Sequence, residues 1–316
     1  MSAFENFPSS IRNSPFTVAQ AQELGLSYAR LRRQDIVNLS RGIKAIHGQD
    51  DAALSLALLT RPYTQVTGYS AASHATAFIL WELPGFLPEA TSGTIHISRQ
   101  YPHSIPRRSG IQGHRTMFDT DEVQLVDGLW LTSRARTWLD CARSMSVEEL
   151  VVTADHLIRI PRPAFERRNE EYVTLEELSE LLSRHPGTPG IVKARAALEL
   201  ARVGSDSPQE TKLRLACSAA GLPEPHLNEP TLLVNGVIRQ PDQSYPDYKV
   251  AVEYDGNTHA DPRQVEKDVL RAEDYANAGW SEVRIMRHHM QNDAKEAVRK
   301  VREALWAHGW RPSSDL

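Results

Sequence analysis

Three carboxylates close to one another in the C-terminal third are the residues best placed by type and spacing to do chemistry. Asp242 follows a proline, and Glu253 and Asp255 stand one residue apart in the stretch KVAVEYDG. Alternate residues of a β-strand face the same side, so Lys249, Glu253 and Asp255 are predicted to share one face. Two acids are therefore presented together.

A turn before this strand would add the third acid. If Tyr245 to Tyr248 form the turn, an antiparallel return brings Asp242 level with Glu253. Like charges held so close raise one another's pKa unless a cation lies among them. Oxygen ligands of this kind suit Mg²⁺ or Mn²⁺, and such an ion can polarise a phosphodiester and lower the pKa of a bound water.

Each neighbouring candidate also has a purely structural interpretation. Glu210 stands three residues after Ser207, which is the spacing of a helix capping box, and Asp255 precedes a glycine as in an ordinary strand-ending turn. Asp268 and Arg271 could simply pair with each other on a helix. Glu253 is harder to explain in this way, because an acid between Val252 and Tyr254 is a poor choice for stability alone.

In this order, the residues resemble a known superfamily. The pattern Pro241-Asp242 followed by Glu253-Tyr254-Asp255 resembles the PD-(D/E)xK nucleases. The run EYDG, then His259, then Asp268 and Arg271, then Gly279-Trp280 is similar to a bacterial domain of unknown function related to the very-short-patch-repair (Vsr) endonucleases. The resemblance covers residues 207–305.

The resemblance implies a fold and a set of roles. The fold is a restriction-endonuclease-like α/β core with a mixed sheet flanked by helices. Asp242 and Glu253 would be metal ligands, Glu210 the acid on the first helix, and His259 a polar participant near the scissile phosphate. These nucleases usually carry a lysine where this chain has Asp255.

The missing lysine leaves two interpretations open. Asp255 is either a third metal ligand, with His259, Lys249 or Arg271 supplying the polar role, or the mark of a core that binds DNA without cleaving it. Lys249 and Arg271 are therefore also candidate DNA-binding residues.

The N-terminal residues predict a small helical module. Thr17 and Gln20 have capping-box spacing, Gly25 closes that helix, and Ser27 is predicted to open a second helix that carries arginines. The stretch IVNLSRGIKAIHG alternates like the β-wing of a winged helix-turn-helix domain. The alternative is a helical cap with solvated arginines.

The first two thirds of the chain also resemble a family. FTVAQAQELGLS, LSRGIKAIHG, TGYSAA and LTSRARTWLD are similar to AbiEi-type antitoxins and transcriptional regulators, which have a winged helix-turn-helix followed by a larger α+β domain. The resemblance implies that Arg30, Arg32 and Arg33 contact DNA. It also implies a toxin or a defence-system component as a partner.

The organisation predicted for the whole chain is α+β and multidomain. The predicted parts are a winged helix-turn-helix (1–50), an α+β middle domain (51–160), a charged helical linker (161–206) and the nuclease-like domain (207–316). In the middle domain, the residues from Ser70 to Trp81 are predicted to form one helix. In the last domain, the predicted order is helix, β-hairpin around Asn235-Gly236, strand, helix, strand, helix.

Composition narrows the class of protein. Over 316 residues, 41% are hydrophobic and 24% charged, which are ordinary values for a folded protein. The net charge of -4 gives no overall attraction to nucleic acid, but two segments are locally basic: residues 27–44, with five basic residues and one acid, and residues 99–115, with four arginines and no acid.

Cellular location is predicted from what the sequence lacks. The N-terminus has no apolar signal region, and the longest apolar stretch, AALSLALL, is too short to cross a bilayer. Cys141 and Cys217 lack metal-ligand spacing and are predicted to be reduced thiols in helices. We therefore expect a cytoplasmic protein that does not associate with membranes.

These observations leave two main functions open. The first is a metal-dependent DNA endonuclease or nickase, with Mg²⁺ or Mn²⁺ on Asp242, Glu253 and Asp255 and a winged helix for docking, in defence or repair. The second is a non-catalytic, AbiEi-like antitoxin or regulator with a degenerate nuclease-like domain. An RNA-processing nuclease would use the same residues.

Overall fold

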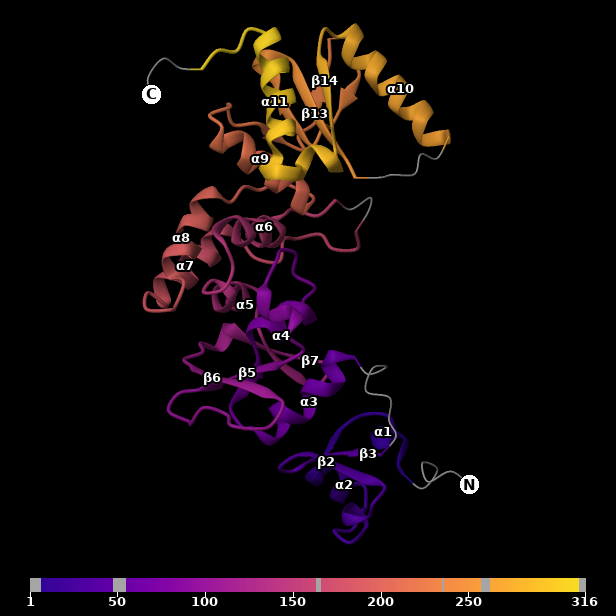
Figure 1. The fold of residues 1–316 in the computed structure, drawn as a ribbon, viewed down its shortest axis with the longest axis vertical. Helices are drawn as coiled ribbons and strands as arrows, with labels where there is room; N and C mark the ends of the chain where they lie inside the picture. The colour runs from indigo at the N-terminus through magenta and orange to yellow at the C-terminus, as the bar shows by residue number, and fades with distance from the viewer. Residues whose placement is uncertain (1–6, 48–54, 163–165, 235, 257–261, 313–316) are drawn as a thin grey trace. The chain divides into compact units, whose positions relative to one another are not determined.

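The computed structural model has α+β architecture with several sheets, as expected from the sequence (Figure 1). It describes residues 7–47, 55–162, 166–234, 236–256 and 262–312, and for 262–268 the backbone alone. Contacts between segments divide the chain into two units. Unit 1 comprises Met1–Ser146 and Glu176–Ala194, and unit 2 comprises Val147–Leu175 and Arg195–Leu316. The four predicted domain ranges remain a prediction.

Unit 1 begins with a small three-stranded sheet and short helices. Its elements are α1 (Ser9–Arg12), β1 (Phe16–Thr17), α2 (Val18–Glu23), β2 (Ile36–Ser40) and β3 (Ile43–Ile46), with strand order β1-β3-β2. Thr17 and Gln20 form the predicted capping box, with Thr17 Oγ1 accepting from Gln20 N at 3.0 Å. The predicted wing corresponds to the antiparallel β2–β3 pair.

The prediction of a second helix from Ser27 was wrong. Only a three-residue 3-10 helix, Arg30–Arg32, forms there, and Arg33 is already extended. A side-chain interaction competes with helix propagation at this point. Both terminal guanidinium nitrogens of Arg30, Nη1 and Nη2, donate to the Asp35 carboxylate at 2.7 Å, which ties the segment to the start of β2.

The larger sheet of unit 1 has the order β6-β5-β4-β8-β7. Its strands are β4 (Ser70–Ala72), β5 (Ile95–Gln100), β6 (Ile111–Thr116), β7 (Val123–Val126) and β8 (Leu129–Thr132). The helices are α3 (Leu56–Val66), α4 (His74–Leu80), α5 (Arg134–Cys141) and α7 (Leu175–Arg184), the last of which begins one residue before the unit's second segment.

The predicted helix from Ser70 to Trp81 was wrong in its first part. Ser70–Ala72 instead form the central strand β4, which pairs antiparallel with β5 and parallel with β8. The residues are small and fully buried, so they fit between two neighbouring strands. The helix begins only after Ser73, whose backbone is extended.

Unit 2 is built around a four-stranded mixed sheet with the order β14-β13-β12-β9. β9 (His226–Leu227), β12 (Gln243–Tyr245) and β13 (Val250–Asp255) pair antiparallel, whereas β13 and β14 (Ser281–Met286) are parallel. A separate hairpin joins β10 (Thr231–Leu232) to β11 (Ile238–Arg239), as predicted around Asn235-Gly236. β12 is the antiparallel segment predicted before the turn, whereas β9 was not predicted.

Helices cover both faces of this sheet (Figure 1). α9 (Pro208–Ala219) and α11 (Gln291–Ala307) pack on the face that carries Val250 and Val252. α10 (Pro262–Asn277) packs on the opposite face, where its Tyr275 contacts Ala251. The alternation predicted for β13 is therefore confirmed from Val250 onward. α6 (Val147–Ile158) and α8 (Ile191–Leu200, of which the last part belongs to this unit) complete the helices.

The described helices also bear on two simpler expectations. None of them combines the length and the apolar character that a bilayer crossing requires. Cys141 in α5 and Cys217 in α9 are buried and unbridged, as predicted.

Candidate functional site

The antiparallel pairing of β12 and β13 brings two of the predicted acids together. Gln243 pairs with Val252, so Asp242 lies opposite Glu253. The turn between the strands is a 3-10 turn, Pro246–Tyr248, close to where the sequence predicted it. Asp242 Oδ2 accepts a hydrogen bond of 2.6 Å from the backbone N–H of Tyr254, which fixes that carboxylate against β13.

Glu210 reaches the same place from the first turn of α9. Ser207 caps this helix, and Glu210 is 6% exposed. Glu210 Oε1 accepts from Ser207 Oγ at 2.8 Å, and its Oε2 accepts from Asp206 N at 2.9 Å and from Asn228 Nδ2 at 2.8 Å. Its capping role is thus present, and the same carboxylate holds the loop after β9.

The acids share an environment that favours their protonated forms. Burial raises the pKa of Glu210 to about 7 and that of Glu253 to about 7, and in both cases the charge of Asp242 raises the pKa further. Burial also raises the pKa of Asp242, while the hydrogen bond from Tyr254 opposes this shift. Asp242 is therefore the acid that raises the pKa of both glutamates.

The positive charge nearest to Glu253 is shared with another acid. Arg271 Nη1 lies 3.8 Å from Glu253 Oε2, whereas Arg271 Nε donates to Glu282 Oε1 at 2.8 Å. Glu282, on the neighbouring strand β14, also pairs with Arg284 at 3.2 Å. Arg271 therefore neutralises Glu253 only in part, because it also hydrogen-bonds to Glu282.

The remaining predicted residues of this region are placed differently. Asp255 is the half-buried last residue of β13, two positions beyond Glu253. The prediction that Lys249 shares the strand face was wrong. Lys249 precedes the strand in a left-handed conformation (φ 50°), because its N–H closes the turn onto Pro246 O at 3.1 Å. His259 lies outside the described residues, as does the side chain of Asp268.

The donors present suit a hard divalent cation held by two carboxylates. Asp242 and Glu253 offer oxygens across one strand pair, and their raised pKa values show that a positive charge there would stabilise the ionised pair. Mg²⁺ is commonly held by one or two carboxylates together with waters and a substrate phosphate. The candidate ligand atoms of Asp242, Glu253 and Asp255 do not all lie within 4.8 Å of one another. Among the described residues, only one other trio meets this distance.

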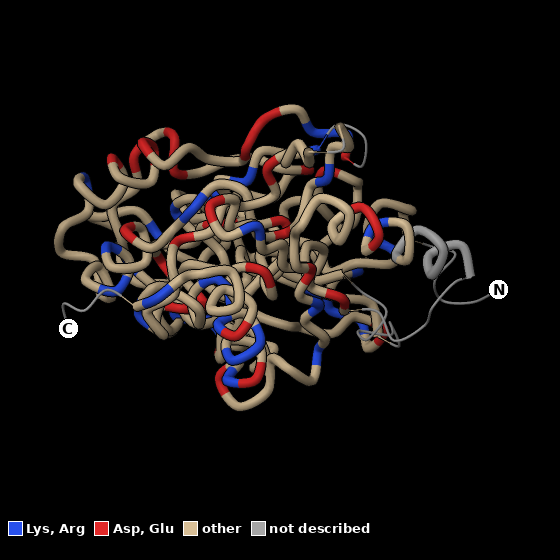
Figure 2. Tube along the Cα trace, turned by 90° about the horizontal axis from the view of Figure 1, so that it is seen from above, with Lys and Arg blue, Asp and Glu red and all other residues tan. Residues whose placement is uncertain are grey.

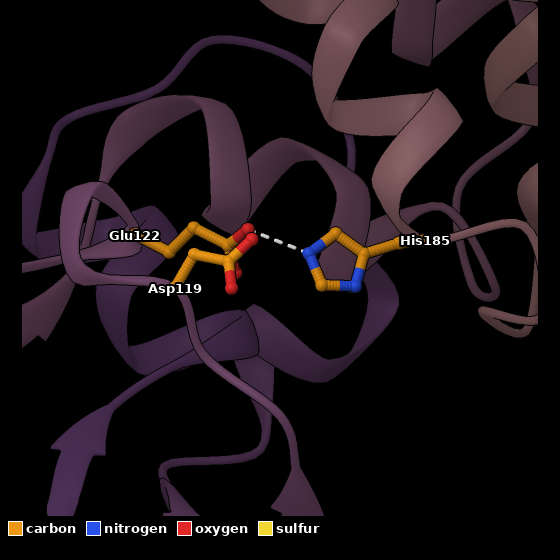
Figure 3. Close-up of side chains that lie close together, drawn as sticks. All are labelled: Asp119, Glu122 and His185. Atoms are coloured by element: carbon orange, nitrogen blue, oxygen red, sulfur yellow. Dashed lines mark hydrogen bonds and ion pairs between the residues drawn. The ribbon is translucent and has the colours of Figure 1, made fainter.

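That trio lies in unit 1 and was not predicted. It consists of Asp119, Glu122 and His185 (Figure 3). His185 Nε2 lies 2.5 Å from Glu122 Oε1, and Arg184 Nη1 lies 2.9 Å from Asp119 Oδ2 and 3.5 Å from Glu122 Oε1. Arg136 Nη1 approaches the other oxygen of Glu122 at 2.5 Å. The acids are already matched by cations, so the trio forms an ion-pair network that anchors the end of α7 to the 119–122 segment.

A histidine-lined cavity of about 710 Å³ also lies in unit 1. The rings of His74 and His114 stack with centroids 3.7 Å apart, and His96 Nδ1 lies 3.1 Å from His114 Nε2. Burial, followed by its two histidine neighbours, lowers the pKa of His114 to about 3. Imidazole lone pairs lie in the ring plane, so stacked rings do not converge on one ion. The three positions lie on separate elements, and no spacing in the sequence reveals them.

The predicted DNA-contacting arginines differ in how far they are engaged. The guanidinium of Arg30 pairs with Asp35 and lies 4.1 Å over the Phe7 ring, so it already has structural partners. Arg32 and Arg33 are exposed.

Comparison with known proteins gives relatives without a described role. The chain is 29% identical over 165 residues to "Uncharacterized protein MT2308" of Mycobacterium tuberculosis strain CDC 1551 / Oshkosh, and equally to "Uncharacterized protein Rv2248" of strain ATCC 25618 / H37Rv. The match covers 52% of this chain and 57% of each relative, so it spans little more than half the length of either. No family model matches the sequence. No solved structure matches it either.

Proposed function

We propose that this protein is a metal-dependent endonuclease or nickase that hydrolyses phosphodiester bonds of DNA. The observation that carries the proposal is the pair Asp242 and Glu253, which face each other across β12 and β13 with raised pKa values and incomplete neutralisation. Two ionised carboxylates would repel a DNA phosphate, and a bound Mg²⁺ or Mn²⁺ removes that repulsion.

Each residue of the site then has a defined task. Asp242, held by the N–H of Tyr254, and Glu253 bind the cation, which when bound lowers the pKa of a water and polarises the phosphate. Glu210 is a positioning residue, because it secures the start of α9 and Asn228 next to the pair. Arg271 limits the negative charge at Glu253. His259 is proposed as a polar participant. Asp255 is proposed as a further ligand, a role that requires its side chain to approach Asp242 and Glu253 more closely than it does in this structure.

The fold supports the same proposal. An antiparallel pair β12–β13 joined to a parallel partner β14, with helices on both faces, is compatible with the PD-(D/E)xK core that the sequence resembles. For the N-terminal residues we propose a winged-helix-like docking module with a reduced second helix, and for the protein as a whole a role inside the cytoplasm.

A non-catalytic regulator of DNA is the second candidate. Asp255 occupies the position where the resembled nucleases have a lysine, and this departure favours a nuclease-like domain that no longer cleaves. In this case the protein would bind DNA as an AbiEi-like antitoxin or repressor and would act with a toxin or a defence-system component.

A plasmid assay distinguishes these functions. Supercoiled DNA is incubated with the wild-type protein, with Glu253→Gln and with Asp247→Asn in Mg²⁺, Mn²⁺ or EDTA, and nicked and linear products are quantified. Asp247 is an exposed acid of the neighbouring turn. Asp247→Asn therefore replaces a carboxylate by an amide, as Glu253→Gln does, but outside the site. We expect metal-dependent cleavage that falls about a hundredfold or more in Glu253→Gln, because a lost ligand removes the several kcal/mol that a bound metal ion supplies, and that persists in Asp247→Asn.

The opposite results are equally clear. Cleavage by a pure Glu253→Gln preparation at the wild-type rate would remove the site from the proposal. If the wild-type protein binds the plasmid but leaves it supercoiled in every metal, the regulator becomes the better account.

A further inference from the structure

Unit 1 contains a concave surface lined by arginines. Lys and Arg are interspersed with Asp and Glu along the chain (Figure 2), so a surface of one sign is a local feature. This open groove has a volume of about 990 Å³, and no acidic residue is among its lining residues. We call it the arginine groove and define it by its five arginines: Arg41, Arg99, the adjacent Arg107 and Arg108, and Arg115.

Two of these arginines are fixed by backbone carbonyls rather than by acids. Arg108 Nη1 donates to Arg41 O at 2.6 Å, and its Nη2 donates to Val66 O at 3.5 Å. Arg99 Nε donates to Gly68 O at 2.9 Å. A carbonyl orients a guanidinium without cancelling its charge.

None of the five arginines forms an ion pair with a carboxylate in the described part of the chain. Burial lowers the pKa of Arg108, and the charges of Arg41 and Arg99 lower it further. Like charges gathered in this way cost stability unless an anion compensates them.

Hydroxyl groups and one unsatisfied donor complete the groove. Ser40, Ser104 and Ser109 line it together with Thr67. Thr67 is only 5% exposed, and its hydroxyl has no hydrogen-bond partner. Ser104 and Ser109 are exposed, so their hydroxyls are within reach of a ligand oxygen, whereas the Thr67 hydroxyl is buried in the groove wall.

We propose that the arginine groove binds the phosphodiester backbone of DNA. Arginines with serine and threonine hydroxyls are the groups that contact phosphates without reading bases, and the groove presents them on one surface. Its openness and the exposure of Arg41, Arg107 and Arg115 suit a polymer better than a small enclosed anion. The choice of DNA as the polymer rests on the proposed function, whereas the groove itself does not depend on cleavage.

Binding is measured in EDTA so that cleavage plays no part. The full-length protein is titrated into a fluorescein-labelled DNA duplex, and anisotropy is followed from about 50 to 200 mM salt. The test variant is Arg41→Gln/Arg107→Gln/Arg115→Gln. Its matched control is Arg167→Gln/Arg195→Gln/Lys295→Gln, which removes the same charge at exposed positions elsewhere. A third variant replaces the groove arginines with lysine.

We expect the glutamine groove variant to bind DNA about tenfold or more weakly than the wild type. The slope of log K against log salt concentration should become less negative by about 3, close to one unit for each lost phosphate contact. The control and the lysine variant should keep the wild-type slope. Circular dichroism and thermal unfolding establish that each variant is folded.

Two results would overturn the proposal. One is an unchanged slope in a folded groove variant. The other is a glutamine groove variant that still binds DNA like the wild type but no longer binds vesicles containing phosphatidylserine. That result would assign the groove to a membrane surface. Failure of the proposed function would look different, because a protein that never cleaves still shows the groove-dependent slope.

Discussion

At Glu253 a single carboxylate links stability to pH. Its pKa in the folded protein is about 7, above the ordinary value of 4.5, because it is buried and faces Asp242. Between these two pH values the folded state holds a proton that the unfolded state lacks, so stability falls as the pH rises from 4.5 through 7. The folded protein thus carries an electrostatic cost at pH 8.

Glu253→Gln should remove that cost. We expect the variant to gain on the order of 1 to 3 kcal/mol relative to wild type between pH 5 and pH 8, since each pKa unit corresponds to about 1.4 kcal/mol. Mg²⁺ at pH 8 should raise the melting temperature of the wild type but not that of the variant. Thermal unfolding at both pH values, with Asp247→Asn as the control, measures the difference. An equal difference at pH 5 and pH 8 would contradict the assigned pKa.

Some features of this site follow from the local sequence, and others depend on residues distant in the chain. The period of two in a strand and the turn after Asp242 were enough to place Asp242 opposite Glu253. The left-handed conformation of Lys249 was not predictable, because it depends on the hydrogen bond that closes the turn. Arg271 contacts both Glu253 on β13 and Glu282 on β14, because the two strands pair in parallel. No local pattern in the sequence predicts which strand pairs with β13.

At the scale of elements, local signals predicted helices well where caps were present and failed where long-range pairing decided. Ser207 and Thr17 marked the starts of α9 and α2 correctly. The residues Ser70–Ala72 have no strong strand signal, and only pairing with β5 and β8 makes them a strand. Arg30 shortened the predicted second helix through its bond to Asp35, a partner beyond the range of helix periodicity.

One strand position controls the shape of the arginine groove. A Cβ atom on Gly113 in β6 would lie 2.0 Å from Pro106 O and 3.0 Å from Pro106 C, both of which are backbone atoms. Gly113→Ala must therefore displace the segment that carries Arg107 and Arg108. We expect a loss of about 1 to 3 kcal/mol in stability from overpacking, together with weaker DNA binding.

Gly187→Ala provides the control for this change, because nothing lies within 4 Å of a Cβ atom there. Thermal unfolding and the anisotropy titration test both effects. If Gly113→Ala binds and melts like the wild type, the segment is not held by this close approach.

At the scale of the whole molecule, the proposals place binding and chemistry in different units. The arginine groove belongs to unit 1, whereas Asp242 and Glu253 belong to unit 2. Charge averaged over the chain conceals this division, since a net charge of -4 includes both a surface that attracts DNA and a site that repels it without a cation. The predicted domain ranges already separate the two sets of residues, since the groove arginines fall within 1–160 and the acids within 207–316. The units themselves are each built from two separate segments of the chain.

Such a division should be visible in steady-state kinetics. If the groove supplies binding that is equal in the ground state and the transition state, its glutamine variant should raise KM about tenfold or more and leave kcat nearly unchanged. Glu253→Gln should do the reverse, lowering kcat with the DNA dissociation constant preserved, because its contribution arises at the reacting phosphate. Initial rates of plasmid cleavage over a range of DNA concentrations separate the two. A groove variant whose kcat falls as far as that of Glu253→Gln would mean that the arginines act in the chemical step, and the division between the units would have to be abandoned.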